Sequence, residues 1–255
     1  MRTTPSRIAL GFVTNFFDTL GIGSFAPTTA FFKLRRWLPD ELIPGTLNVG
    51  HALPTLLQAL IYIGTVNVAR STLMSMIGAA VFGAWLGAGH VTRLPRRAIQ
   101  VGMGIALVVA ALIFAGVNLE WLPGGGDATG LEGEKLGIAV CINFVLGTLM
   151  TLGIGLYAPC MILVSLLGMS PIVAFPIMMG SCALLMPVAG IRFVRAKRYD
   201  PPAVWGLALG GLPAVLIAAY VVRSLPLFWL RWLVFAVVLC AATTMLHSAW
   251  KGDKA

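Results

Sequence analysis

The sequence has little charge: only 11% of its 255 residues are Asp, Glu, Lys or Arg, whereas 58% are hydrophobic. A soluble domain carries charge on about 25% of its residues, so this composition excludes an ordinary water-soluble fold. The mean hydropathy of +0.91 agrees. Apolar stretches of about 20 residues, long enough to cross a bilayer as helices, recur along the chain. We therefore expect an all-α integral membrane protein whose main surroundings are the lipid bilayer.

Recognisable catalytic and metal-binding motifs are missing. The four cysteines show no CxxC or CxxH spacing, which argues against a zinc site or a disulfide framework and favours small buried apolar residues. The chain also lacks the ATP-binding loop GxxxxGK[ST] and the enzyme motifs HExxH and GxSxG. We expect no cofactor, no metal and no enzymatic activity. An intramembrane enzyme using Asp18, His51 or a cysteine is an alternative.

Acidic residues are scarce as well, with nine Asp and Glu against eighteen Lys and Arg and a net charge of +9. In a soluble protein this charge would suggest a nucleic-acid partner. In a membrane protein Lys and Arg first report orientation, so no nucleic acid is expected. The basic cluster at 192–198 either sets topology beside anionic lipid or attracts anions to one mouth of the protein.

One nine-residue stretch occurs twice. Residues 19–27 are TLGIGSFAP and residues 151–159 are TLGIGLYAP, identical at seven of nine positions and 132 residues apart. The first copy lies in an apolar run that follows basic residues, as in a secretory signal peptide. The second copy lies in the middle of the chain, where no signal is cleaved, so we expect the N-terminal run to stay in the mature protein.

A polar interval divides the chain near its midpoint. Residues 117–135 contain three consecutive glycines and four of the nine acidic residues, which is typical of a linker. The predicted organisation is an N-terminal membrane repeat at 1–116, a polar linker loop at 117–135 and a C-terminal membrane repeat at 136–255.

The distribution of Lys and Arg predicts how the apolar segments cross the membrane. The expected segments are approximately 8–32, 43–66, 72–91, 98–116, 136–168, 171–191, 202–222 and 227–247. If all eight cross, ten basic residues lie on one side and seven on the other. If segments 8–32 and 136–168 turn at their glycines and return to the side of entry, the balance becomes fourteen against three. The second arrangement satisfies the positive-inside rule.

Each half is then one re-entrant or broken helical hairpin plus three transmembrane helices. Three crossings are an odd number, so the second half is inserted upside down relative to the first, as an inverted-topology repeat. Both termini are expected in the cytoplasm of a multi-pass protein of the cell inner (plasma) membrane. The protein could also assemble as a homodimer.

The repeated break predicts a binding site. Backbone that leaves the helix inside a bilayer survives only where protein or a water-filled cavity surrounds it. Pro27 and Pro159 suit the first turn of a helix, so the second arm of each hairpin should begin at Ser24–Pro27 and Leu156–Pro159. Two inverted copies would then aim two helix N-termini, which favour anions, at one place near the midplane. The alternative is that the glycines and prolines only permit tight packing or kinks.

The residues expected to bind the anion lie at or beside the breaks. They are Thr19, Gly21, Gly23, Ser24, Phe25, Ala26, Thr28, Thr29, Thr151, Gly153, Gly155, Tyr157, Ala158, Cys160, Asn48 and Ser181. Ser181 follows Gly180 at nearly the same place in the second half as His51 does after Gly50, which predicts a further break there.

Two ionisable residues are candidates for coupling transport to protons. Asp18 is the only acidic residue within an expected membrane segment. Because burying a charge in a membrane is costly, an ionisable residue there is expected to have a function. Its repeat counterpart is Met150. His51 lies in NVGHALP, on a segment where Gly50 and Pro54 predict another break, and imidazole titrates near neutral pH. The alternatives are a loop-bracing role for Asp18 and a hydrogen-bonded structural role for His51.

The chain resembles the sulfite exporter TauE/SafE family, also called the toluene sulfonate uptake permease family, over residues 11–34, GFVTNFFDTLGIGSFAPTTAFFKL, and 147–168, GTLMTLGIGLYAPCMILVSLLG. Members of this family carry two copies of a membrane domain with glycine-rich motifs. The resemblance implies a permease for sulfite or small organosulfur anions, with transport coupled to a proton gradient. Many members have denser glycines after the turn, where this chain has Ser24-Phe25 and Leu156-Tyr157.

The expected function is therefore secondary transport of a small sulfur-containing anion such as sulfite, thiosulfate or an organosulfonate. One repeat would rock against the other around the paired motifs, with protons as the coupling ion. A passive anion channel built from the same hairpins is the alternative.

Overall fold

A computed structural model describes residues 4–90, 126–151 and 155–224, with scattered residues between 101 and 121 and between 232 and 250. Helices dominate the described residues, whose sole bridge-like pairing outside helices joins Ala128 and Met169. Three helical stretches among them are long and apolar enough to cross a membrane: Gly133–Met150, Pro171–Arg195 and Pro201–Val221. The predicted all-α class is confirmed, and these stretches fit an integral membrane protein.

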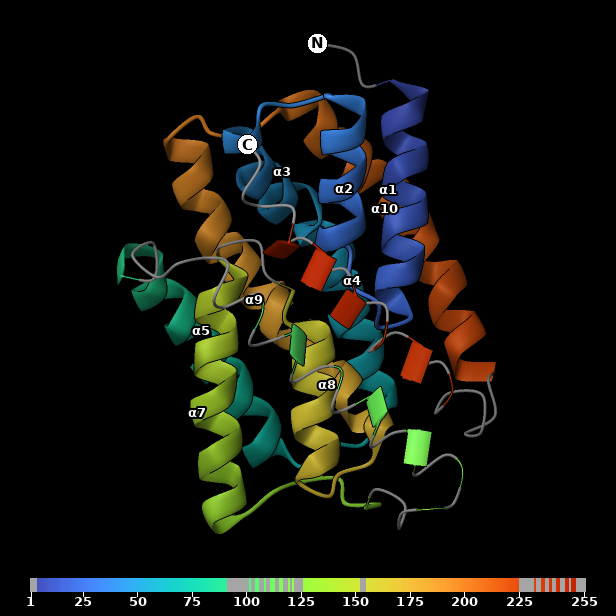
Figure 1. Ribbon diagram of the computed structural model, residues 1–255, viewed down its shortest axis with the longest axis vertical. Helices are drawn as coiled ribbons and strands as arrows, with labels where there is room; N and C mark the ends of the chain where they lie inside the picture. Colours follow the sequence, from blue (N-terminus) through green and yellow to red (C-terminus); the bar gives the residue numbers. More distant parts are fainter. Residues whose placement is uncertain are drawn as a thin grey trace.

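The first half of the chain begins with two antiparallel helices separated by a short break. In Figure 1 the first of them descends from the N-terminus to the middle of the molecule, and the second returns towards the same end. A broken helix then leads to the opposite end, and a long helix leads back. These elements are α1 (Pro5–Thr19), α2 (Phe25–Arg35), the 3-10 turn η1 (Asp40–Leu42), α3 (Ile43–Gly50), α4 (Ala52–Thr65) and α5 (Arg70–His90).

The second half starts from the opposite end of the molecule. In Figure 1 its first helix rises from the lower edge to the middle, and the next helix descends again. Two long helices follow, of which the first runs up towards the end where the chain begins and the second runs back down to about the middle of the molecule (Figure 1). These elements are α7 (Gly133–Met150), α8 (Tyr157–Leu166), the 3-10 turn η3 (Pro171–Val173), α9 (Ala174–Arg195) and α10 (Pro201–Ser224).

Helices of the two halves pack mainly against each other. The α1 helix lies along α10, α7 lies along α5, and α9 lies against both α4 and α5. Glycines allow the close approach: a Cβ at Gly210 of α10 would collide with Ile8 O of α1, and one at Gly147 of α7 would collide with Ala80 O of α5. Small residues at such contacts are how membrane helices pack without a hydrophobic driving force.

Two asparagines, one on α1 and one on α7, reinforce these contacts. Asn15 of α1 donates from Nδ2 to Leu207 O of α10 at 3.4 Å, and Asn143 of α7 donates from Nδ2 to Met76 O of α5 at 2.7 Å. All four residues are buried. A side-chain amide that bonds to the backbone of the neighbouring helix fixes the register between the two helices.

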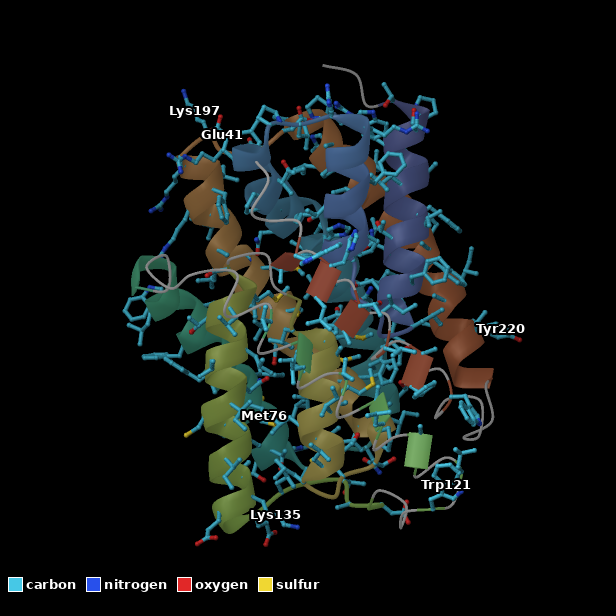
Figure 2. The ribbon with its side chains drawn as sticks, viewed as in Figure 1. Glu41, Met76, Trp121, Lys135, Lys197 and Tyr220 are labelled. Atoms are coloured by element: carbon cyan, nitrogen blue, oxygen red, sulfur yellow. The ribbon has the colours of Figure 1, made fainter. Side chains whose placement is uncertain are left out.

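The outer surface shows the pattern expected for a protein embedded in lipid. Large apolar side chains such as Leu60, Met74 and Leu216 are more than half exposed on the sides of the helices. Charged side chains lie at the ends, where Figure 2 shows Glu41 and Lys197 at one end and Lys135 at the other. Exposed apolar patches of this extent indicate contact with a membrane or a partner protein.

The predicted break at His51 is confirmed, and the one predicted at Gly180 and Ser181 is wrong. The α3 helix ends at Gly50 and α4 begins at Ala52, whereas α9 continues without interruption through Gly180. A Cβ at Gly180 would lie 2.6 Å from Ile77 Cδ1 of α5. This glycine therefore serves close helix packing and leaves the backbone helical.

The expected segments 98–116 and 227–247 lie largely outside the described residues. Among the isolated described positions within them, Ala111 and Ala242 are helical and buried, whereas Ile105 and Leu239 are helical and exposed. The middle of the expected linker, 122–125, is likewise outside the described part of the chain.

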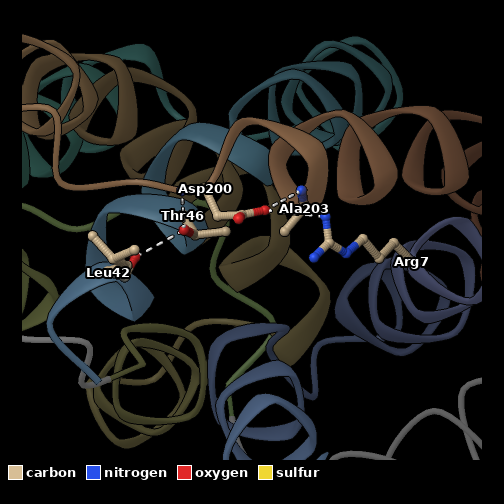
Figure 3. A network of polar contacts seen from close by, with 5 residues as sticks. All are labelled: Arg7, Leu42, Thr46, Asp200 and Ala203. Atoms are coloured by element: carbon tan, nitrogen blue, oxygen red, sulfur yellow. Dashed lines mark hydrogen bonds and ion pairs between the residues drawn. The ribbon is translucent and has the colours of Figure 1, made fainter. Parts of the chain in front are cut away.

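A polar network ties the start of α1 to α10 and α3 (Figure 3). Arg7 Nη1 lies 3.2 Å from Asp200 Oδ1, and the same carboxylate oxygen accepts the Ala203 N–H at 2.7 Å, as an N-cap of α10 does. The Asp200 N–H donates to Thr46 Oγ1 at 2.9 Å, and that hydroxyl donates to Leu42 O at 2.8 Å. One aspartate thus joins three helices.

Substitutions in this network can measure the stabilisation from the helix cap separately from that of the ion pair. We expect Asp200→Ala to lower stability by about 0.5–2 kcal/mol more than Asp200→Asn, because asparagine still caps a helix. Arg7→Gln should resemble Asp200→Asn, since a partly exposed ion pair contributes about 0–1 kcal/mol. Thermal unfolding in detergent micelles measures the differences, and equal losses for both Asp200 variants would contradict the capping role.

Candidate functional site

Both copies of the repeated motif form a break between helices. In the first copy α1 ends at Thr19 and α2 begins at Phe25, with Gly21 and Gly23 at φ +93° and +87°. Side chains rarely adopt this left-handed conformation, so the turn requires glycine at both positions. The Ser24 carbonyl accepts the first helical hydrogen bond, from the Thr28 N–H at 3.1 Å. The predicted start of the second arm is confirmed.

The second copy repeats this arrangement in the other half. Here α7 ends at Met150 and α8 begins at Tyr157, and the Leu156 carbonyl accepts the Cys160 N–H at 3.0 Å. Pro159 lies in the first turn of α8, where its missing N–H removes no helical bond. Gly153 lies outside the described residues.

A buried polar cluster joins the two breaks. Gln58 of α4 donates from Nε2 to Asp18 Oδ2 at 2.9 Å and to Thr19 Oγ1 at 3.0 Å. The Tyr157 hydroxyl lies 3.0 Å from Gln58 Oε1 and 3.4 Å from Asp18 Oδ2. None of these four side chains is more than 4% exposed. Asp18 and Thr19 end the first helix of one motif and Tyr157 begins the second helix of the other, so Gln58 connects the two copies.

The tyrosine in this cluster has one proton and two acceptors. Its O–H therefore donates either to the Gln58 carbonyl oxygen or to the Asp18 carboxylate at any moment. The Asp18 carboxyl accepts from Gln58 in both arrangements. The cluster can thus rearrange its hydrogen bonds without moving a helix.

A second tyrosine completes the end of the first hairpin arm. Tyr62, one turn beyond Gln58 on α4, donates its hydroxyl to Thr19 O at 3.1 Å. Its ring stacks on Phe175 of α9, with centroids 5.1 Å apart. The carbonyl at the end of α1 has lost its helical partner, and Tyr62 supplies the bond from within the protein.

Two buried hydroxyls beside the cluster have no hydrogen-bond partner. Ser24 Oγ, at the start of α2, and Thr55 Oγ1, three residues before Gln58 on the same face of α4, are both inaccessible to solvent. Ser24 is near the Asp18 carboxyl and Thr55 is near the Tyr157 hydroxyl, but neither contact has hydrogen-bond geometry. A buried hydroxyl without a partner costs about 1–3 kcal/mol, so a ligand that bonded to either hydroxyl would recover that cost.

Open space adjoins the corresponding glycine of each motif. A Cβ added to Gly23 or to Gly155 would meet no atom within 4 Å, although both glycines are half-buried. At Gly21 the same addition would approach Met161 Cε of α8 to 2.9 Å. Gly21 therefore packs against the second half, while Gly23 and Gly155 border unfilled space.

His51 lies at the α3–α4 break and bonds through both ring nitrogens. Its Nδ1 is 3.0 Å from Asn15 Oδ1 and its Nε2 is 3.2 Å from Thr28 Oγ1. The Asn15 Nδ2 group donates to Gly11 O at 2.7 Å, which leaves the amide oxygen facing His51. The network thus assigns the proton to Nδ1 and makes Nε2 an acceptor for Thr28. His51 holds α1, α2 and the broken helix together, beside the Phe25 ring.

Several predicted site residues form bonds elsewhere. Ser181 accepts from Asn143 Nδ2 at 3.2 Å, and Asn48 donates to Pro44 O at 2.9 Å while its Oδ1 has no partner. Thr151 donates to Thr148 O at 2.7 Å and closes the end of α7. None of these three has a described hydrogen bond to the Gln58 cluster.

The remaining predicted residues lie in the first turns of the second arms. Ala158 and Cys160 are buried in α8, Thr29 is half-buried in α2, and Ala26 belongs to α2 with its side chain outside the described residues. Met150, the counterpart of Asp18, accepts a weak hydrogen bond from Cys182 Sγ at 3.3 Å. The same place in the two halves is therefore acidic in one and sulfur-lined in the other.

Gln58, Thr55 and Tyr62 are functional candidates that the sequence analysis missed. One signal was available: Gln58 is one of only two glutamines in the chain and stands alone in the apolar run ALPTLLQALIYIGT. An isolated amide in a membrane helix needs a partner on another helix. Thr55 and Tyr62 carried no comparable signal, because single hydroxyls are common in membrane helices.

The chain matches no protein-family model, no curated protein and no solved structure. The site is therefore interpreted from its own geometry. It combines one carboxyl group, several neutral hydrogen-bond donors and two helix N-termini. In the described part of the chain, no three His, Cys, Asp or Glu side chains are grouped so as to hold a metal ion.

The cluster predicts strong energetic coupling between Gln58 and Tyr157. We expect Gln58→Leu to cost about 1–3 kcal/mol, because it leaves buried polar groups without their partner. Combined with Tyr157→Phe, it should cost at least about 0.5 kcal/mol less than the sum of the single losses. Unfolding of all variants in detergent measures this coupling. Gln58→Leu with Asn143→Leu is the control pair and should be additive; additivity in both pairs would contradict the cluster.

Proposed function

We propose that this protein is a secondary transporter of a small sulfur-containing anion, such as sulfite, thiosulfate or an organosulfonate. The observation that carries the proposal is the meeting of the two motif breaks at the Asp18–Gln58–Tyr157 cluster, beside unpartnered hydroxyls. The N-termini of α2 and α8 begin at these breaks. Free N–H groups and the positive end of the helix dipole bind anions at such positions.

We further propose that the two halves are inverted-topology repeats. Support comes from the packing: the pairing of α1 with α10 has its counterpart in the pairing of α7 with α5. The two broken hairpins also start from opposite ends of the molecule in Figure 1. Basic residues fall fourteen to three on one side in this arrangement, which favours an inner-membrane protein with both termini in the cytoplasm.

The proposal that the protein belongs to a sulfur-anion transporter family depends on two segments of the sequence. Residues 11–34 and 147–168 resemble the glycine-rich motifs of the sulfite exporter TauE/SafE family, whose members transport sulfite and related anions. The broken helices and the polar cluster between them are compatible with such a permease. Because the resemblance is confined to these segments, the choice of sulfur anions depends on it, whereas the anion site depends on the geometry.

Asp18 gives a physical route to proton coupling. An ionised carboxylate beside the N-terminus of α2 would repel an incoming anion across a medium of low dielectric constant. Protonation of Asp18 removes this repulsion. The protonated carboxyl group can still accept the hydrogen bond from Gln58. The anion and a proton would therefore occupy the site together and cross together as the two halves rock.

The open space beside the glycines predicts which substitutions block transport. We expect Gly23→Leu and Gly155→Leu each to abolish counterflow in proteoliposomes while membrane insertion stays normal, because the side chain fills the space. Gly137→Leu is the control: this glycine of α7 is exposed and also has open space around it, so transport should persist.

Strain and filling can be separated at the first motif. Gly23→Ala imposes the left-handed backbone conformation on a side chain, at about 1–3 kcal/mol, but adds little volume. We expect it to reduce stability more than transport. Normal transport by either leucine variant at Gly23 or Gly155 would contradict a substrate site between the motifs.

Replacing Asp18 tests the coupling. We expect Asp18→Asn to keep the bonds to Gln58 yet make anion counterflow independent of the transmembrane pH gradient, because the amide cannot exchange a proton. Uptake at two pH gradients, with wild-type protein alongside, measures the effect. Wild-type flux that ignores the gradient would favour a passive channel, and a gradient dependence retained in Asp18→Asn would remove this residue from coupling.

A further inference from the structure

The charged groups around the site restrict the net charge of the anion that the site can bind. Among the buried residues that the structure describes there is no lysine or arginine, and Asp18 is the sole acidic one. The described basic side chains near the site's helices instead lie at the ends of the molecule, as Lys135 and Lys197 do in Figure 2. Arg7 is engaged with Asp200.

The groups that can face an anion are therefore neutral donors. Ser24 Oγ and Thr55 Oγ1 have no partner, whereas the Gln58 amide and the Tyr157 hydroxyl already donate within the cluster. The other positive contribution comes from the N-termini of α2 and α8, each equivalent to about half an elementary charge. Together the two helix ends balance roughly one negative charge.

The cost of dehydration makes this balance decisive. The energy of moving an ion from water into a medium of low dielectric constant rises with the square of its charge, so a dianion costs about four times as much as a monoanion. Two helix ends and neutral hydroxyls offset the cost for one charge and fall short for two. Ionised Asp18 would add a further negative charge and increase the shortfall.

We infer that the site between the two breaks accepts small monoanions, such as hydrogen sulfite and alkanesulfonates, and rejects dianions such as sulfate, thiosulfate and fully ionised sulfite. This inference rests on the proposed function and selects among the anions named there. It assigns Ser24 and Thr55 as the hydroxyls that contact the anion, and it makes the charge of the substrate the property that the site recognises.

Counterflow into proteoliposomes containing the wild-type protein tests the inference with four probes: methanesulfonate, sulfite, sulfate and thiosulfate. Methanesulfonate stays a monoanion at every pH used, and sulfate and thiosulfate stay dianions. Sulfite changes from one charge to two near neutral pH. The ratio of sulfite flux to methanesulfonate flux at each pH cancels any titration of the protein itself, including that of Asp18.

We expect methanesulfonate to be transported at least about tenfold faster than sulfate and thiosulfate. A tenfold difference corresponds to about 1.4 kcal/mol. The flux ratio should fall with rising pH in proportion to the remaining hydrogen sulfite. Comparable flux of sulfate or thiosulfate, or a ratio that stays constant or rises, would overturn the inference while leaving anion transport intact. It would direct attention to Arg231, the basic residue of the expected segment 227–247 outside the described residues. Absence of counterflow with all four probes would instead overturn the proposed function, and the inference with it.

Thr55→Val and Ser24→Ala test the assigned hydroxyls. Because neither hydroxyl has a partner in the structure, their removal should leave the thermal unfolding temperature unchanged or raise it. We expect each to raise the KM for methanesulfonate by about tenfold, the value of one hydrogen bond to a charged group. Thr65→Val is the control, since that exposed hydroxyl bonds within α4. An unchanged KM in both site variants would remove these hydroxyls from the binding site.

Discussion

The structure depends on one constraint: backbone that leaves a helix inside a membrane must find hydrogen-bond partners within the protein. The chain leaves the helix in both copies of the motif, between Thr19 and Phe25 and between Met150 and Tyr157. At the first break Gly21 N–H bonds back to Asp18 O at 2.9 Å, and Tyr62 supplies a donor to Thr19 O. Neither break could persist facing lipid, so the rest of the fold encloses them.

Enclosing the breaks makes the two halves interdependent. The first helix of each half lies along a helix of the other, α1 along α10 and α7 along α5. The broken helix α3–α4 then brings His51 and Gln58 against the first motif. Since the polar cluster takes residues from both motifs, a shift of one half against the other must remake its hydrogen bonds. This is the physical basis on which a rocking motion could alternate access to the site.

The proposed anion site differs from a typical one because the structure describes no basic side chain in it. Hydroxyls, an amide and helix ends bind through hydrogen bonds without a full positive charge, so the bound anion must be easy to dehydrate. Such a site would also release its substrate readily, as the proposed carrier must do at each turnover. In the proposed transport, the asymmetry between Asp18 and its counterpart Met150 would confine proton exchange to one half of the protein.

The sequence by itself determined the features that local chemistry controls. Low charge predicted the all-α membrane class, the repeated glycines and prolines predicted both helix starts, and Gly50 and Pro54 predicted the broken helix at His51. Gly180 shows the limit of such reasoning, because a glycine in a sequence can indicate either a helix break or a close helix contact. The position of Ile77 beside Gly180 in the folded chain shows that this glycine serves a close contact. Gln58 meets Asp18 from 40 residues away and Tyr157 from 99. A lone glutamine has no identifiable partner until folding brings those helices together, so the existence of two breaks was local information and the polar cluster that joins them was decided by tertiary structure.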